Sequence, residues 1–209
     1  MNNMLSEALQ QFVGLLNQLM KNLLGNDAEL WGNELKKFLR KEPCWVKVEK
    51  AVASILRSIS ASVTISATTG TKTITSAKEV FTGYLDPDFK NWGLDVPEEA
   101  KPETPVQVYE MFQDGDFKTI FSSLGRSLDD LCLTQEQIIA FVCDHKQWLR
   151  TGGYSTFFLF KVAGEFFVAF VGLSTDGGPG VGVGRVSSAG VWRGGFRRRI
   201  VLPQLTLES

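Results

Sequence analysis

The stretch that decides the fold runs from Leu133 to Leu173 and reads LTQEQIIAFVCDHKQWLRTGGYSTFFLFKVAGEFFVAFVGL. In its first half, apolar residues recur at helical spacing behind Thr134, whose hydroxyl makes it a good N-cap. Gln137 completes the pattern of a capping box. The pair Gly152–Gly153 can supply the left-handed residue that ends many helices. We therefore expect one capped helix from Thr134 to Arg150.

The second half of this stretch holds two segments that are apolar on both faces, Thr156–Val162 and Phe166–Val171, joined by Ala163 and Gly164. Loss of alternation is typical of central strands that are covered on both sides. A two-stranded hairpin this apolar is not stable alone in water. We expect the Thr134–Arg150 helix to cover one face and the N-terminal part of the chain to cover the other.

Two further strand candidates follow the hairpin, Val181–Val186 and Arg197–Leu202. Strands that follow one another without intervening helices argue against a parallel, Rossmann-like sheet. The fold class that we predict is α+β, with an antiparallel sheet of three to five strands in the C-terminal half packed on helices. An N-terminal helical pair completes it.

The N-terminal pair is predicted from two amphipathic patterns separated by Gly25. Met4–Leu24 has a leucine-rich stripe, and the residues after Asp27 repeat apolar positions at helical spacing. This gives an N-terminal helical hairpin over residues 1–42 and an α+β domain over residues 43–209, with residues 103–209 as its best-defined core.

The middle of the chain carries weaker signals. Val46–Ser60 fits a helix by spacing and precedes a β-like composition, so its structure stays open. The segments expected to form strands are Val63–Ala67, Thr71–Thr75 and Glu79–Leu85. The segments expected to form helices begin at Pro87, at the capping-box pattern Thr104–Gln107, and at Phe117 after the break Asp114–Asp116.

Composition excludes several classes of protein. The chain has 209 residues, 44% of them hydrophobic, and a formal net charge of -1, which gives no overall attraction to nucleic acid or to an anionic membrane. Cys44, Cys132 and Cys143 are irregularly spaced and predict reduced thiols. We expect no signal peptide and no membrane span, because no apolar run approaches about 18 residues. The expected location is cytoplasmic.

The only histidine, His145, stands two residues after Cys143. A cysteine–histidine nucleophilic pair is one interpretation, but residues at i and i+2 of a helix point to different sides. A histidine packed at the edge of the core is the simpler interpretation. The aspartate pairs Asp86–Asp88 and Asp114–Asp116 are typical of caps and turns. We expect neither a metal site nor a cofactor, since Gly177–Gly184 also lacks the residues of a phosphate-binding loop.

The strongest functional signal is a C-terminal segment of four arginines and two aromatic residues, which could hold phosphates and stack bases. The candidate binding residues are Trp192, Arg193, Phe196, Arg197, Arg198 and Arg199. Strand alternation would place Arg197 and Arg199 on one face and Arg198 on the other. The alternative is a charged edge strand that avoids aggregation, paired with the acidic loop Leu94–Glu103.

A further observation concerns five segments, Trp148–Tyr154, Thr156–Val162, Arg197–Leu205, Asp88–Trp92 and Thr104–Tyr109. They resemble an uncharacterised protein family of uncultured small-genome bacteria, and the resemblance covers most of the chain after Glu79. The family has no known function, so it assigns no functional residues. It implies a bacterial, cytoplasmic protein.

Three hypotheses about function remain. The first is a non-enzymatic binding or interaction domain that self-associates through the Met4–Leu24 helix. The second is a nucleic-acid-binding protein that uses the C-terminal arginines and aromatic residues. The third is a small hydrolase-like enzyme around Cys143 and His145.

Overall fold

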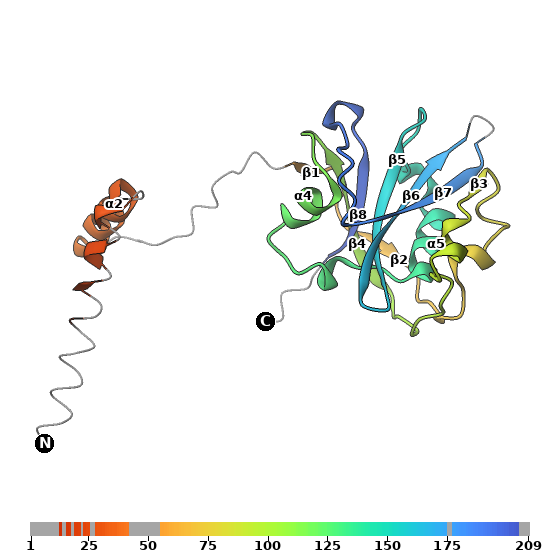
Figure 1. Cartoon of the computed structure of the whole chain (residues 1–209), viewed down its shortest axis with the longest axis horizontal. Helices are drawn as coiled ribbons and strands as arrows, with labels where there is room; N and C mark the ends of the chain where they lie inside the picture. The colour runs from red at the N-terminus through yellow and green to blue at the C-terminus, as the bar shows by residue number, and fades with distance from the viewer. Residues whose placement is uncertain are drawn as a thin grey trace, which may run out of the picture. The chain divides into compact units, whose positions relative to one another are not determined.

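An eight-stranded mixed sheet is the central feature of the computed structural model (Figure 1). The structure describes residues 13, 16–17, 19–21, 23–25, 28–41, 55–174 and 177–204. The chain forms two units, Met1–Val52 and Ala53–Ser209, and the sheet belongs to the second. The boundary predicted at residue 42 stays a prediction, because residues 42–54 lie outside the described part of the chain.

The sheet has the strand order β1-β4-β8-β5-β6-β7-β3, and β2 also pairs with β4. The strands are β1 Leu56–Ser58, β2 Val63–Ile65, β3 Tyr84–Leu85, β4 Thr104–Met111, β5 Ser155–Val162, β6 Glu165–Leu173, β7 Pro179–Arg185 and β8 Arg199–Pro203. The helices of this unit are α3 Asp88–Asn91, α4 Phe117–Ser122 and α5 Gln135–Asp144. Short 3-10 turns are η1 Ile74–Ser76, η2 Asp129–Leu131, η3 Lys146–Trp148 and η4 Gly194–Phe196.

The prediction of an antiparallel sheet of three to five strands is wrong, although the α+β class is right. β8 runs parallel to β5, and β3 runs parallel to β7. The β5–β6–β7 meander is antiparallel, as predicted. The error arises because β8 does not pair with β7, the strand before it in the chain, but inserts between β4 and β5.

The strand that sequence reasoning missed is β4. Its capping-box pattern predicts a helix, but the Thr104 hydroxyl donates to the Pro102 carbonyl at 2.9 Å and accepts from the Gln137 side chain at 2.7 Å. Val106 and Val108 are buried, and the strand pairs with β8 along five residues. Pairing on both sides and burial of β-branched residues outweigh the local helix signal.

Both faces of the sheet are packed, as the apolar hairpin predicts. On one face, Phe158 and Phe160 pack in a core with α5. On the other, Phe157 and Leu159 pack in a core with α4, and the two helices can be followed in Figure 1. The N-terminal part of the chain was expected to cover this second face, but the described cover is mainly α4. Each fully buried Phe contributes roughly 1.5–3 kcal/mol through burial alone.

The α5 helix begins as predicted and ends early. Thr134 Oγ1 accepts from the Gln137 N–H at 3.2 Å, and Gln137 Oε1 accepts from the Thr134 N–H at 2.9 Å, so the capping box is present. The helix stops at Asp144 rather than continuing to Arg150. His145 leaves the helical conformation, with φ -128° and ψ 34°, and a 3-10 turn follows.

Of the shorter elements that the sequence predicts, some are present in the structure and others are not. Asp116 caps α4 by accepting from the Thr119 N–H at 2.7 Å, and a short helix follows Pro87, both as predicted. The strand expected over Thr71–Thr75 is wrong, because η1 occupies its end. Of Glu79–Leu85, two residues are strand. The undecided segment Val46–Ser60 contains β1, while its first nine residues lie outside the described part.

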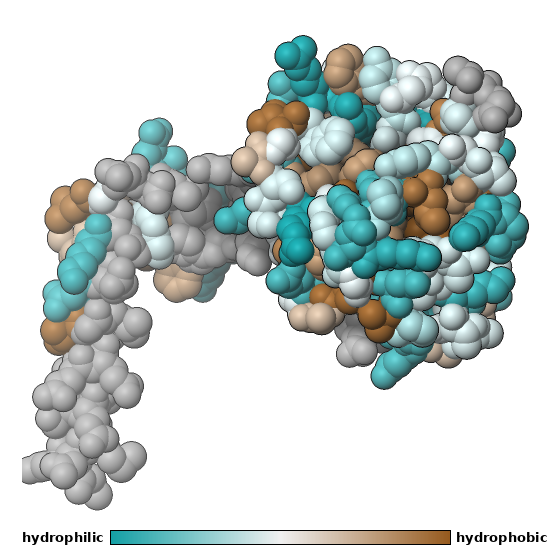
Figure 2. All heavy atoms as spheres, turned by 45° about the vertical axis from the view of Figure 1, so that its right-hand side comes forward, coloured by the Kyte–Doolittle hydropathy of each residue, from teal (hydrophilic) through white to brown (hydrophobic). Residues whose placement is uncertain are grey.

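In the N-terminal unit, the structure describes one complete helix, α2 Ala28–Leu39. Trp31 and Leu35 are half-buried, whereas Phe38 is 58% exposed. The predicted Met4–Leu24 helix falls mostly outside the described residues, although those described within it are helical. Within the described part of the chain, no helix has the length and apolar character to cross a membrane. Hydrophilic and hydrophobic residues are mixed on the visible face of the larger unit (Figure 2).

Candidate arginine–aromatic binding site

The predicted C-terminal segment is anchored at its start to the loop that precedes α4. The Trp192 N–H donates to the Gly115 carbonyl at 2.8 Å, and the Gly194 N–H donates to Asp114 Oδ1 at 2.9 Å. A Cβ on Gly194 would lie 2.4 Å from the Gln113 backbone nitrogen, so this close approach requires glycine. The segment therefore runs as a fixed turn and not as a strand.

This turn changes how the arginines are displayed. Arg197 has a left-handed backbone, with φ 53°, and β8 begins only at Arg199. The predicted alternation of Arg197 and Arg199 against Arg198 is therefore wrong. The alternative of a charged edge strand is wrong as well, since β8 lies between two other strands. No ion pair joins the arginines to the acidic loop Leu94–Glu103 within the described residues.

Three of the six predicted residues are held in structural contacts. Trp192 is half-buried, and its ring lies 5.2 Å from that of Phe117 and 5.0 Å from that of Phe157. Arg197 lies 3.7 Å from the Phe112 ring centre and pairs with Glu110 at 3.4 Å. The third is Arg199, which donates to backbone carbonyls.

Arg199 turns toward the η3 turn. Its Nη1 donates to the carbonyls of Gln147 and Leu149 at 3.4 and 3.3 Å. These contacts tie the start of β8 to the turn that precedes β5. The contacts leave Arg193, Phe196 and Arg198 as the predicted residues that remain available for a ligand.

Two residues from a distant part of the chain join them. The Phe196 ring stacks on that of Tyr154, with centres 4.8 Å apart and planes at 18°. Arg150 lies 5.5 Å from the Tyr154 ring centre, and its Nε donates to the Phe196 carbonyl at 3.4 Å. We call these residues the arginine–aromatic surface: Arg150, Tyr154, Arg193, Phe196 and Arg198.

Arg198 lies at the centre of the arginine–aromatic surface. Its guanidinium carbon is 4.7 Å from the Trp192 ring centre, 5.1 Å from that of Phe196 and 5.7 Å from that of Tyr154. Its Nη1 donates to the Arg193 carbonyl, while its Nε is buried with no hydrogen-bond partner among the described residues. Part of its donor capacity is therefore unused.

The charge of this surface is not neutralised. Among the described residues, no carboxylate lies within ion-pair distance of Arg150, Arg193 or Arg198. Burial lowers the pKa of Arg198, and burial together with the neighbouring Arg150 lowers the pKa of Arg199. Both stay protonated near neutral pH, because an arginine begins from a pKa above about 12. The arrangement can hold an anion beside an exposed ring.

The cysteine–histidine segment is arranged differently from a nucleophilic pair. The half-buried His145 donates from Nε2–H to the Thr64 carbonyl at 2.8 Å, since a carbonyl can only accept, and its ring lies 5.3 Å from that of Phe141. Burial, and then the Asp144 charge, raise the pKa of the Cys143 thiol. A nucleophilic cysteine needs a lowered pKa and a nearby base. This geometry gives no support to the hydrolase hypothesis.

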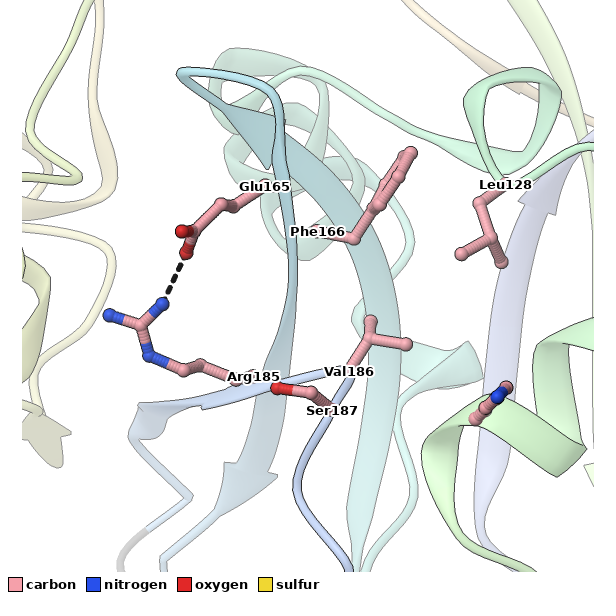
Figure 3. Close-up of a pocket in the computed structure, with 7 residues that line it drawn as sticks. Leu128, Glu165, Phe166, Arg185, Val186 and Ser187 are labelled. Carbon is pink, nitrogen blue, oxygen red and sulfur yellow. Dashed lines mark hydrogen bonds and ion pairs between the residues drawn. The ribbon is translucent and has the colours of Figure 1, made fainter.

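A cavity of about 390 Å³ lies on the α4 side of the sheet (Figure 3). Its apolar wall comes from Leu128, Phe166 and Val186, and the ion pair between Glu165 and Arg185 lies at its rim. Glu165 and Arg185 neutralise each other, so Lys118 is the lining residue whose charge has no carboxylate partner among the described residues.

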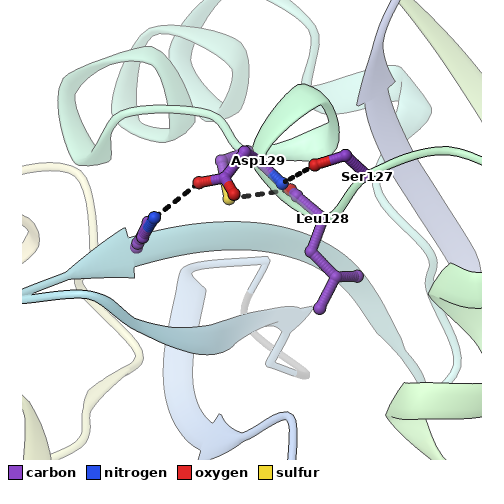
Figure 4. A network of polar contacts seen from close by, with 5 residues as sticks. Ser127, Leu128 and Asp129 are labelled. Atoms are coloured by element: carbon purple, nitrogen blue, oxygen red, sulfur yellow. Dashed lines mark hydrogen bonds and ion pairs between the residues drawn. The ribbon is translucent and has the colours of Figure 1, made fainter.

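A polar network supports the η2 turn beside this cavity (Figure 4). The Asp129 N–H donates to the Ser127 hydroxyl at 3.1 Å, and Lys161 pairs with Asp129 at 2.5 Å. The Cys132 thiol donates to the Leu128 carbonyl at 3.2 Å. Burial, aided by the Asp129 charge, raises the pKa of Cys132 to about 12, so this thiol is unreactive.

The described residues contain no cluster of histidine, cysteine and carboxylate side chains that could hold a metal ion. Comparisons of the chain with protein-family models, with curated proteins and with solved structures find no match. The resemblance noted in the sequence therefore stays a prediction.

Proposed function

We propose that this protein is a non-enzymatic binding domain that binds single-stranded nucleic acid through the arginine–aromatic surface. The observation that carries the proposal is the stack of Tyr154 and Phe196 between two arginines, Arg150 and Arg198, that have no carboxylate partner among the described residues. A cytoplasmic location fits this function.

The chemistry of the ligand follows from the two kinds of group. Unpaired arginines bind phosphates and release counterions, which makes binding strongly dependent on salt. An exposed aromatic ring stacks on a base, at about 1–3 kcal/mol for each base. Phe196 is 36% exposed and so presents part of its ring to solvent. A single strand offers both phosphates and unstacked bases, whereas a duplex hides its base faces.

The test is fluorescence anisotropy of a labelled single-stranded oligonucleotide, titrated with the full chain at several salt concentrations. The charge reversal Arg150→Glu/Arg198→Glu should weaken binding at least tenfold and flatten the salt dependence. The matched control is Lys78→Glu, which reverses an exposed charge outside the site and should bind as the unchanged chain does. No binding at low salt, or an equal loss in the control, would contradict the proposal.

Self-association is a second candidate function, favoured by exposed apolar residues in the N-terminal unit. Val13, Leu16, Met20 and Leu24 are between 45% and 80% exposed. If they form a contact between two copies, sedimentation equilibrium should give a dimer, and Leu16→Lys/Met20→Lys should give a monomer. Asn17→Lys, at an exposed polar position of the same helix, is the control. A monomeric unchanged chain at high concentration would rule this function out.

A further inference from the structure

A groove with a glycine-rich lining lies on the α4 side of the sheet, where β5 begins and β6 ends. Its volume is about 260 Å³. We call it the glycine groove; its lining includes Tyr84, Ser155, Phe170, Gly172, Gly180 and Gly182. The pairs Ser155–Gly172 and Phe170–Gly182 are direct cross-strand neighbours, so these side-chain positions share one face of the sheet.

The glycine groove adjoins the arginine–aromatic surface. The residues on either side of Tyr154 line it, and a Cβ on Gly172 would lie 3.6 Å from the Tyr154 carbonyl oxygen. A second contact runs through Phe170, which lines the groove. Its ring lies 6.1 Å from the Trp192 ring, and the Arg198 guanidinium lies over that Trp192 ring. A nucleic-acid strand bound at the arginines would therefore pass beside the groove.

The glycines of this groove serve two purposes. At Gly182 a Cβ would lie 2.1 Å from the Phe170 ring, so glycine is needed for Phe170 to lie across β7. At Gly172 a Cβ would be in ordinary van der Waals contact with the Tyr154 carbonyl oxygen at 3.6 Å and with Ser155 Oγ at 3.8 Å, so a side chain fits there without a clash and would occupy part of the groove. A bare backbone beside an aromatic wall admits a flat ring more easily than a bulky or branched group.

The groove also offers polar groups to the edge of such a ring. The Ser155 and Tyr84 hydroxyls have no hydrogen-bond partner among the described residues, and Tyr84 is 57% exposed. A drug-sized ligand usually occupies a pocket of roughly 300–1,000 Å³. The smaller glycine groove suits one heterocycle with a few hydrogen-bonding atoms.

We infer that the glycine groove receives one nucleobase of the strand whose phosphates bind the arginine–aromatic surface. This inference rests on the proposed function and assigns the groove as its base pocket. The bound base lies against the backbone at Gly172, with Phe170 and Tyr84 as side walls.

The experiment compares an ordinary single strand with an abasic strand of the same length, which keeps the phosphates and lacks the bases. The variant Gly172→Val fills the groove at a strand position where valine is favourable. Ser155→Val fills it from the neighbouring strand and serves if the first variant unfolds. Gly190→Val is the control, because a Cβ there meets no atom within 4 Å. Circular dichroism checks that each variant is folded.

The unchanged chain should bind the ordinary strand more tightly than the abasic one. Filling the groove should reduce affinity for the ordinary strand about tenfold, the loss expected for one stacked base, and leave affinity for the abasic strand unchanged. If the unchanged chain binds but neither filling variant weakens binding, the groove inference is overturned and the proposed function stands. If the unchanged chain binds neither strand at low salt, both are overturned.

Discussion

Two regions of the larger unit place an arginine against aromatic rings, and they differ by one carboxylate. Arg185 lies 5.1 Å from the Trp92 ring centre and 5.2 Å from that of Phe167, and it pairs with Glu165. Arg198 lies at similar distances from three rings and has no such partner among the described residues.

The difference teaches that residue type alone does not make a binding site. Stacking against a ring orients a guanidinium in both regions. Where a carboxylate is also present, the arginine closes a hairpin and its charge is neutralised. Where the carboxylate is missing, the charge remains available for an external anion. Substitutions in the two regions can test whether the carboxylate partner makes this difference.

The largest effect is expected when a carboxylate is introduced beside Arg198. Phe196→Glu should weaken single-strand binding more than tenfold, or about 1.4 kcal/mol, because it neutralises Arg198 and removes a stacking ring. Trp92→Glu is a matched control beside Arg185, since both aromatic residues are 36% exposed. Anisotropy titrations at low salt measure both. Equal losses at the two positions would show that the regions do not differ in binding.

For the stability of the fold, unlike for binding, the substitution near Arg185 should have a larger effect than the one near Arg198. Arg185→Ala removes an ion pair and two cation–π contacts, so the free energy of unfolding should fall by about 1 kcal/mol. Arg198→Ala removes three cation–π contacts and one hydrogen bond, but it also relieves the repulsion among arginines without carboxylate partners, so the net change should stay within about 0.5 kcal/mol. Urea unfolding followed by tryptophan fluorescence measures both values. A larger loss for Arg198→Ala would mean that this arginine is structural.

Two carboxylates near the start of α5 should also differ in their effect on stability, because one has more hydrogen-bond partners for its charge than the other. Burial raises the pKa of Glu98 above its ordinary 4.5, despite a hydrogen bond from the Gln135 N–H. Burial also acts to raise the pKa of Glu136, but hydrogen bonds from the Thr69 hydroxyl and backbone N–H groups outweigh it and lower the pKa. Ionised Glu98 therefore costs stability, whereas ionised Glu136 contributes to it.

The signs give a pH experiment. The Glu98 contribution is complete below pH 4.5 and is lost as the pH rises through its raised pKa, so Glu98→Gln should stabilise the protein at pH 7 and not at pH 4. The Glu136 contribution is present above pH 4.5 and is lost as the pH falls through its lowered pKa, so Glu136→Gln should destabilise at pH 7. The melting temperatures of both variants, measured at pH 4 and pH 7, test these signs. If both variants shifted the melting temperature in the same direction at pH 7, the opposite roles given to Glu98 and Glu136 would be wrong.

The smallest effect is expected from freeing Arg185. Glu165→Gln leaves Arg185 without its carboxylate and adds one positive charge, so affinity for a single strand at low salt should rise roughly twofold. The gain should disappear as salt is added. Asp88→Asn, which removes a negative charge from α3, is the control for a general charge effect. An equal rise in both variants would show that net charge, not the local partner, sets affinity.

Local signals in the sequence were enough for several elements. The Thr134 capping box, the Asp116 cap and the apolar β5–β6 hairpin all appear where the sequence places them. Each depends on hydrogen bonds between residues that are close together in the chain, so the local sequence carries the signal. The capping-box pattern at Thr104 failed for the complementary reason, because its strand is stabilised by β8, almost a hundred residues later.

Of the candidate site, too, the sequence predicted one part and missed another. The segment with Arg193, Phe196 and Arg198 is recognisable from its composition, and its binding role stays a prediction. Arg150 and Tyr154 were missed, since nothing near them in the chain marks a site. The Gly152–Gly153 pair between them was visible in the sequence, but α5 ends earlier, at Asp144, and the contact of Tyr154 with Phe196 was not visible.

The sequence by itself determined which segments are apolar, where helices start, and that arginines and aromatic rings are concentrated near the C-terminus. Only the tertiary structure decided that β8 lies between β4 and β5, that Trp192 packs against the core, and that among the described residues Arg197 has a carboxylate partner whereas Arg198 has none. The physical reason is that a side chain's availability depends on its neighbours in space. Those neighbours come from strands paired across long separations in the chain.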